Sequence, residues 1–235
     1  MRHLNRVLLF CVCAAVAQAS VIVPNALAGV EGAGANTFPF DSITAQRYQQ
    51  VYAASQFSAG GLITQVAFRP DGPLGHAFSV TIANVQIDLS TTLAAPDGLS
   101  STFASNVGLD DRVVFSGPLS LSSSFAGPAG GPKAFDIIVN LTTPFVYNPG
   151  SGNLLLDVRS FSGEPSGMAG EFDSQFTLGD PISRAYGDIA SPTASVMDSE
   201  GLVTEFTIIP EPGTLVLLAI GILLVLVGVT HRRQA

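Results

Sequence analysis

Short runs of β-branched and aromatic residues, separated by Gly, Pro, Asp and Ser, recur through the middle of the chain. Such runs predict strands that are bounded by turns. Residues 62–68 (LITQVAF) are one example, because the turn sequence Arg-Pro-Asp-Gly follows at once. We expect further strands at residues 48–57, 78–89, 112–115, 135–141, 145–147, 153–161, 172–178 and 202–209.

The alternation of apolar residues changes phase once within the run at residues 78–89. Phe78, Val80 and Ile82 alternate on one face, and the pattern then resumes one position out of step at Val85. One extra residue in a strand produces such a shift. The sequence therefore predicts a β-bulge at Ala83 and Asn84, or a kink at a sheet edge.

The arrangement of the predicted strands indicates one all-β domain at residues 29–209. There is no helical stripe longer than three turns and no repeat of fixed period between the eight or nine strands. This pattern favours a single antiparallel β-sandwich, jelly-roll-like in topology. The Ser/Gly/Pro-rich residues 116–132 would suit a linker between two domains. However, Leu119, Leu121 and Phe125 nearly alternate, which favours a strand followed by a tight loop.

The first 28 residues have the order of a secretory signal peptide. A basic start, Met1 to Arg6, precedes the apolar residues 7–17, which we expect to form a signal helix. Two small-x-small sites follow for signal peptidase, so a cut after Ala19 and a cut after Ala28 both stay open. The small residues of these sites are Ala17, Ala19, Ala26 and Ala28. Both cysteines lie before either cut, so the mature chain would contain no disulfide.

The last residues predict a transmembrane helix at 214–230. This segment contains no charged residue, and as a helix it would be roughly 25 Å long, near the lower limit for crossing a bilayer. His231, Arg232 and Arg233 follow it. Basic residues beyond a membrane helix favour the cytoplasmic side, which agrees with export of the body by the signal peptide.

The triplet Pro210, Glu211 and Pro212, the apolar helix and the basic end together resemble the PEP-CTERM sorting signal of Gram-negative bacteria. The resemblance covers residues 210–235. It implies that an exosortase, a membrane-embedded cysteine transpeptidase, cuts near the triplet. The chain would then pass through the inner membrane only transiently and would reach the cell surface or the medium. Proteins of this kind commonly occur in bacteria that make extracellular polysaccharide.

The net charge of the exported part has the opposite sign to that of typical nucleic-acid-binding proteins. The whole chain has a net charge of −8, and residues 29–209 contain six basic against seventeen acidic residues, a net charge of −11. A protein that neutralises phosphates needs a basic face, so nucleic acid is excluded as a partner. An acidic body is expected to be soluble.

The predicted domain contains few residues suited to catalysis. His76 is its single histidine, in a loop that enters a strand, and no Gly-x-Ser-x-Gly or Gly-x-Gly-x-x-Gly sequence is present. A zinc site would need mostly carboxylates, since the domain contains no cysteine. We therefore expect a protein that is not an enzyme and that has no cofactor.

Two functions that depend on carboxylates, glycoside hydrolysis and calcium binding, stay open as alternatives. Glycoside hydrolysis needs two acids at a set separation, and Glu171 with Asp173 would share a strand face, whereas Asp110 and Asp111 would diverge. Calcium binds oxygen ligands in loops, for which residues 197–201 (MDSEG) are a weak candidate.

We therefore expect an exported surface or matrix protein with a structural or interaction role. The alternative is a carbohydrate-binding module for extracellular polysaccharide, and a secreted hydrolase comes third. Sugar-binding sandwiches use exposed aromatic rings. The chain has no Trp, so such a platform would consist of Tyr48, Tyr52, Tyr147 or Tyr186. Clustering of these tyrosines or of carboxylates in a concavity would distinguish the three hypotheses.

Overall fold

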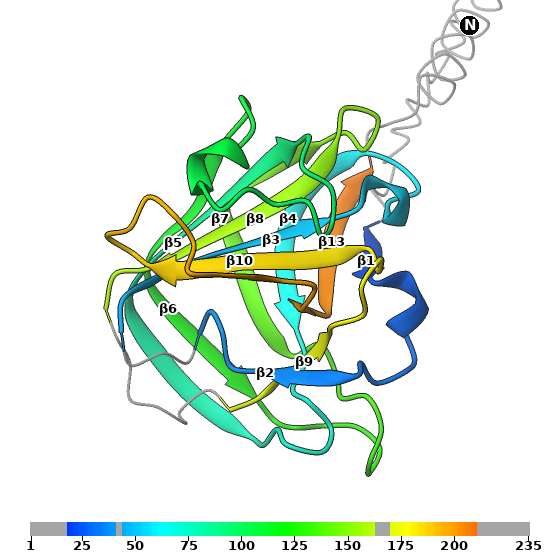
Figure 1. The fold of residues 1–235 in the computed structure, drawn as a ribbon. Coiled ribbons are helices and arrows are strands. Elements are labelled where there is room, and N and C mark those ends of the chain that lie inside the picture. The colour runs from blue at the N-terminus through cyan, green and yellow to red at the C-terminus, as the bar shows by residue number, and fades with distance from the viewer. Residues whose placement is uncertain (1–17, 41–43, 163–169, 211–235) are drawn as a thin grey trace, which may run out of the picture.

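The computed structural model describes residues 18–40, 44–162 and 170–210 (Figure 1). These residues form strands joined by loops and by three short 3-10 helices, η1 (Asn25–Leu27), η2 (Ala54–Gln56) and η3 (Phe103–Ser105). The strands are β1 (Ala19–Val23), β2 (Gly34–Asn36), β3 (Gln46–Tyr52), β4 (Gly61–Phe68), β5 (Phe78–Thr92), β6 (Arg112–Ser123), β7 (Ile137–Tyr147), β8 (Asn153–Ser160), β9 (Phe172–Gln175), β10 (Ile182–Asp188), β11 (Val196–Asp198), β12 (Gly201–Leu202) and β13 (Thr204–Pro210).

The strands form three antiparallel sheets. One sheet has the order β1-β13-β4-β7, the second has the order β11-β10-β3-β8-β5-β6, and a small third sheet has the order β12-β9-β2. The four-stranded and six-stranded sheets contribute side chains to one shared hydrophobic core. The predicted all-β antiparallel sandwich is therefore confirmed.

Alternate residues of the facing strands fill this core. Ile63 of β4 and Ile208 of β13 belong to the same core cluster as Ile87 of β5 and Leu156 of β8, and each of them is almost completely buried. Aromatic rings add edge-on contacts, for example between Tyr52 of β3 and Phe206 of β13. The alternate residues of β5 and β8, among them Asp88 and Asp157, point to the opposite face of the six-stranded sheet.

The predicted β-bulge is confirmed. Strand β5 runs without a break, and its pairing with β6 changes register between Ile82 and Val85. The Ser-rich stretch after residue 116 also forms a strand and not a linker. Leu119 and Leu121 of β6 are buried in the core, and Phe125 follows the strand with a φ of 55°.

Both ends of the folded domain differ from the expected limits of 29 and 209. Strand β1 and helix η1 lie before residue 29, and β13 continues to Pro210. Strand β1 pairs with β13, which explains why residues 19–23 are ordered. The described strands therefore begin before residue 29, and the sequence did not indicate β1 because a short strand next to an apolar leader has no pattern of its own.

Strand β10 has no apolar alternation and was not predicted. Its Ser183 and Arg184 point to opposite faces, yet both are buried. The Ser183 hydroxyl accepts a hydrogen bond from the backbone N–H of Asp97, and Arg184 binds two carboxylates. Polar side chains fill these positions because each one finds a partner from a distant segment.

The two predicted helices at residues 7–17 and 214–230 lie outside the described residues. Within residues 18–40, 44–162 and 170–210, no helix has the length and apolar character that crossing a membrane requires.

Candidate functional site

Two polar rows cross the outer face of the six-stranded sheet. Strands β3, β8 and β5 lie side by side, and residues opposite each other in neighbouring strands share a face of the sheet. The first row is Arg47, Arg159 and Gln86, and the second row is Gln49, Asp157 and Asp88. These six residues, which we call the polar ladder, point away from the core that Leu156 and Val158 enter.

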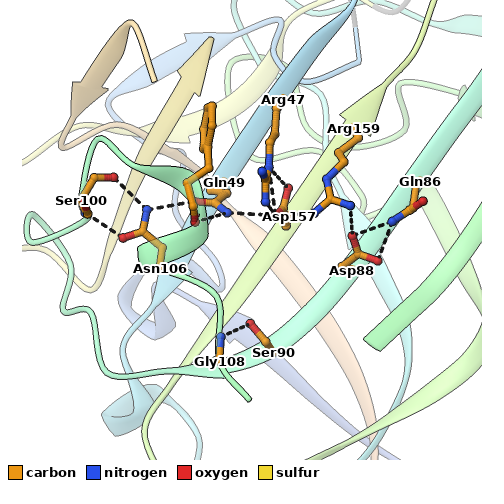
Figure 2. Close-up of polar contacts among 11 residues, drawn as sticks. Arg47, Gln49, Gln86, Asp88, Ser90, Ser100, Asn106, Gly108, Asp157 and Arg159 are labelled. Carbon is orange, nitrogen blue, oxygen red and sulfur yellow. Dashed lines mark hydrogen bonds and ion pairs between the residues drawn. The ribbon is translucent and has the colours of Figure 1, made fainter. Parts of the chain in front are cut away.

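Ion pairs connect the two rows of the polar ladder (Figure 2). Asp157 lies at the centre and accepts from Nε of Arg47 at 3.0 Å, from Nε2 of Gln49 at 2.9 Å and from Nη2 of Arg159 at 3.3 Å. Asp88 pairs with Nη1 of Arg159 at 3.1 Å and accepts from Nε2 of Gln86 at 2.9 Å. Every charge of the ladder therefore has an opposite charge beside it.

The segment 93–111, which we call the cover loop, lies over part of this face and contains η3 (Figure 2). Phe103 of the loop is fully buried, and the guanidinium carbon of Arg47 lies 4.8 Å from its ring centroid. Asn106 donates to Oε1 of Gln49 at 2.9 Å and to the carbonyl of Ser100 at 2.8 Å. The backbone N–H of Gly108 donates to the hydroxyl of Ser90 at 3.2 Å. These contacts hold the loop on the sheet and fix the ladder beneath it.

The cover loop buries the acids of the ladder more than its arginines. Asp88 and Asp157 are each 1% exposed, whereas the side chains of Arg47 and Arg159 are 16% and 24% exposed. Burial also raises the pKa of Asp88 above its usual value. The groups of the ladder that face solvent are therefore the guanidinium donors of the two arginines, and the carboxylates of the two aspartates lie beneath them.

A second feature of this side is an open hollow of about 390 Å³ beside the cover loop. Its walls include Thr92 of β5 and Leu93, Val107 and Leu109 of the loop. Leu93 and Leu109 are both strongly exposed. The hollow lacks the charged pairs of the ladder, so it offers mainly apolar contact.

The acids that the sequence suggested for glycoside hydrolysis do not form an open pair. Asp173 is fully buried, where its Oδ2 accepts from Nε of Arg69 at 2.6 Å and its Oδ1 accepts from the N–H of Gly32 at 2.9 Å. It cannot reach a substrate there, so its pairing with Glu171 at a catalytic surface is wrong. Asp110 accepts from the backbone N–H of Thr91 at 2.7 Å.

Asp111 lies near enough to the acids of the polar ladder to be affected by their charge. Its pKa is raised by partial burial and by the negative charges of Asp88 and Asp157. Asp111 is exposed, as is its neighbour Asp110, so both carboxylates are accessible beside the ladder.

The carboxylates of the calcium candidate at residues 197–201 bind an arginine instead. Asp198 accepts from Nε of Arg184 at 2.8 Å, and Glu200 pairs with the same guanidinium. A different group, Glu31, Asp71 and Asp173, brings three carboxylate oxygens within 4.8 Å of one another. Arg69 already supplies a positive charge to that group, and we assign no metal to it.

The tyrosines do not form the exposed platform that a sugar-binding module would use. Tyr48, Tyr52 and Tyr147 are at most 1% exposed, so the tyrosine platform that would have favoured a carbohydrate-binding module is not formed by them. Tyr186 stacks on Phe38 with ring centroids 4.8 Å apart. His76 is exposed in the loop between β4 and β5.

The buried carboxyl of Asp173 predicts an unusual pH dependence of stability. Burial raises its pKa to about 6, because the loss of water outweighs the opposing charge of Arg69. A carboxyl whose pKa is raised in the folded state contributes stability that is complete below its unfolded value near 3.8 and is lost as the pH rises through about 6. We therefore expect the free energy of unfolding, measured by urea titration, to be roughly 1 kcal/mol larger at pH 5 than at pH 7.5.

Other acids shift in the same direction, so the control for this prediction is a substitution. Burial also raises the pKa values of Asp71, Asp88, Asp111 and Asp180. The Asp173→Asn variant should reduce the difference between pH 5 and pH 7.5 by roughly 1 kcal/mol, and the difference that remains belongs to the other acids. A wild-type protein that becomes less stable on acidification over this range would contradict the prediction.

The sequence contains a pattern that indicates the polar ladder, although the strand predictions above made no use of it. Polar residues occupy alternate positions inside apolar strand sequences, as in Gln86 and Asp88 of β5 and in Asp157 and Arg159 of β8. Charged residues at a spacing of two within a strand indicate a shared polar face. Only the pairing of the strands shows that these residues meet.

The predicted processing residues lie at the two ends of the described chain. Ala19 begins β1, Ala26 lies in η1, Ala28 follows it at the surface, and Pro210 ends β13. Ala17, Glu211, Pro212, His231, Arg232 and Arg233 lie outside the described residues.

The C-terminal segment matches a known sorting motif. Residues 209–233 match the family model of the PEP-CTERM protein-sorting motif, and none of the curated proteins matches the chain. The match agrees with the resemblance of the triplet, the apolar segment and the basic end. It supports export, processing by an exosortase and a place at the surface or outside the cell. The chain is therefore an exported protein that carries a PEP-CTERM protein-sorting signal.

Proposed function

We propose that the exported domain is a non-enzymatic surface or matrix protein that binds extracellular polysaccharide through its polar ladder. The observation that carries the proposal is the arrangement of Arg47 and Arg159, whose guanidinium groups are partly exposed and held in place by the buried carboxylates Asp88 and Asp157. Rigid planar donors of this kind suit a ligand with many oxygen atoms.

Preorganisation is the physical reason why this face suits a binding role. A long arginine side chain normally loses rotamer freedom when it binds a ligand, and that loss weakens binding. Here the ion pairs and the ring of Phe103 already order Arg47. The remaining donor edges are therefore available for sugar hydroxyls at a small entropic cost.

The burial of the ladder acids favours binding over hydrolysis. A catalytic carboxyl must come within hydrogen-bond distance of the reacting oxygen. Asp88 and Asp157 are each 1% exposed and are bound to arginines. Asp110 and Asp111 are both exposed, but Asp110 accepts a hydrogen bond from the backbone N–H of Thr91, and adjacent residues of an extended segment point in opposite directions, which does not suit the facing pair that glycoside hydrolysis requires.

The sorting signal supports the choice of ligand by location. Export brings the domain to the outside of the cell, where polysaccharide is abundant in bacteria that use this signal. The acidic charge of the domain favours a neutral, hydroxyl-rich polymer over a strongly anionic one.

The test is binding of the mature protein to the extracellular polysaccharide of its own host. We expect Arg159→Gln to weaken binding about 10-fold or more in a sedimentation or calorimetric titration, because hydrogen bonds to charged groups contribute about 1.5–3 kcal/mol. Arg112→Gln is the matched control. Arg112 is an exposed arginine opposite Leu89, so it lies on the other face of the same sheet and should leave binding unchanged.

Two results would overturn the proposal. One is equal binding by the wild type and the Arg159→Gln variant while both melt cooperatively. The other is a steady release of reducing sugar ends from the polysaccharide that Asp111→Asn abolishes, which would indicate a hydrolase.

A further inference from the structure

Strand β1 is an integral part of the sandwich although it lies within the predicted signal segment. All five of its residues pair with β13, from Ala19 opposite Ile208 to Val23 opposite Thr204. Val23 is fully buried and belongs to the hydrophobic core. The hydroxyl of Ser20 donates to Glu205 across the same strand pair.

The residues after β1 are also bound to the body of the domain. The backbone N–H of Asn25 donates to Oε1 of Gln56 at 2.8 Å, and Nδ2 of Asn25 donates to the carbonyl of Gln56 at 3.0 Å. The carbonyl of Val30 accepts from Nη2 of the buried Arg69 at 2.6 Å. The chain from 19 to 30 is therefore attached at its beginning, middle and end.

A cut after Ala28 would remove a large part of these contacts. It would leave β13 with β4 as its neighbour in that sheet and would expose a row of backbone hydrogen-bonding groups on its other side. The core would lose Val23 and keep a cavity there. The new charged N-terminus at Gly29 would also lie next to Val30, whose carbonyl binds Arg69.

We infer that signal peptidase cuts after Ala19, so that the mature protein begins at Ser20 and keeps strand β1. Ala17 ends the apolar residues 7–17, and Gln18 and Ala19 follow directly, as a peptidase site should. This cut leaves residues 20–30 in the mature chain. The site after Ala28 has suitable small residues but lies inside the folded domain.

This assignment places both processing sites at one end of one strand pair. Ser20 lies opposite Thr207 in the antiparallel pair, and Pro210 ends the partner strand. Neighbouring strands lie about 5 Å apart and rise about 3.4 Å per residue, so the new N-terminus lies roughly 10 Å along the sheet from Pro210. Signal peptidase and exosortase would thus act at the same end of the domain, next to the membrane.

The test is the N-terminal peptide of the mature protein, isolated from the native host and identified by mass spectrometry. We expect it to begin at Ser20. A protein that begins at Gly29 would overturn the inference.

Two variants of the full-length precursor, each with an alanine of one cleavage site replaced by phenylalanine, make this test more specific. Ala28→Phe blocks the second site at an exposed position, and we expect the amount and the N-terminus of the mature protein to stay unchanged. Ala19→Phe blocks the first site, and we expect uncut precursor to accumulate or a Gly29 product to be degraded. A Gly29 product that reaches the surface in the wild-type amount and melts at the wild-type temperature would contradict the role of β1.

Discussion

Replacing Arg69 by alanine is expected to lower the free energy of unfolding by about 3–5 kcal/mol. Arg69 is fully buried, and its guanidinium binds the carboxyl of Asp173 and the carbonyl of Val30. Its guanidinium carbon also lies 4.9 Å from the ring centroid of Phe135. The variant would leave a buried carboxylate without its partner, which costs more than the loss of an exposed ion pair.

The position of Arg69 in the fold explains why the effect should be large. Arg69 follows β4, Asp173 belongs to β9, and Val30 belongs to the segment between η1 and β2. One side chain thus joins the end of β4, an inner strand of the four-stranded sheet, to the small sheet and to the N-terminal segment. Without it, the carboxyl of Asp173 and the carbonyl of Val30, which belong to two different segments, lose a partner together.

Urea unfolding of the mature protein at pH 8 measures this effect, with Arg112→Ala as the matched control. Arg112 is exposed, so its removal should change the free energy of unfolding by less than about 0.5 kcal/mol. The cost of Arg69→Ala should also be smaller at pH 5, because Asp173 without its arginine binds a proton more readily in the folded state. Equal costs for the two variants would contradict the prediction.

Replacing Glu211 by glutamine is expected to leave most of the protein uncut at its C-terminus. By its resemblance to the PEP-CTERM motif, Glu211 lies in the triplet at which the exosortase cuts, and Gln retains its size while it removes the charge. The wild-type protein should end near residues 210–212 and be found outside the inner membrane. The variant should retain Ala235 and remain in the inner membrane, as shown by intact mass in each cell fraction.

Glu205→Gln is the control for this experiment. Glu205 lies on the same strand as Pro210 and keeps an acceptor oxygen for Ser20 after the change, so processing should continue. If the wild-type protein itself retains Ala235 in the inner membrane, then the C-terminal helix is a permanent anchor and the proposed release is wrong.

The sequence alone determined the parts of this protein whose physics is local. A membrane helix depends on the length and apolar character of one continuous segment, so the prediction of a helix at residues 214–230, which lie outside the described residues, needs no partner segment. The strand at residues 62–68 and the bulge after Ile82 follow from the alternation along a single strand, and β4 and β5 confirm them.

Only the tertiary structure decided which polar residues meet. Arg69 and Asp173 are 104 residues apart, and Arg47 and Asp157 are 110 apart, so no local pattern connects them. Strand β10 and strand β1 were missed for the same reason, because the partners that make them stable lie far along the chain. Side chains of Tyr48 and Tyr52 could face solvent or core until the pairing of β3 set their direction, and the pairing placed them in the core.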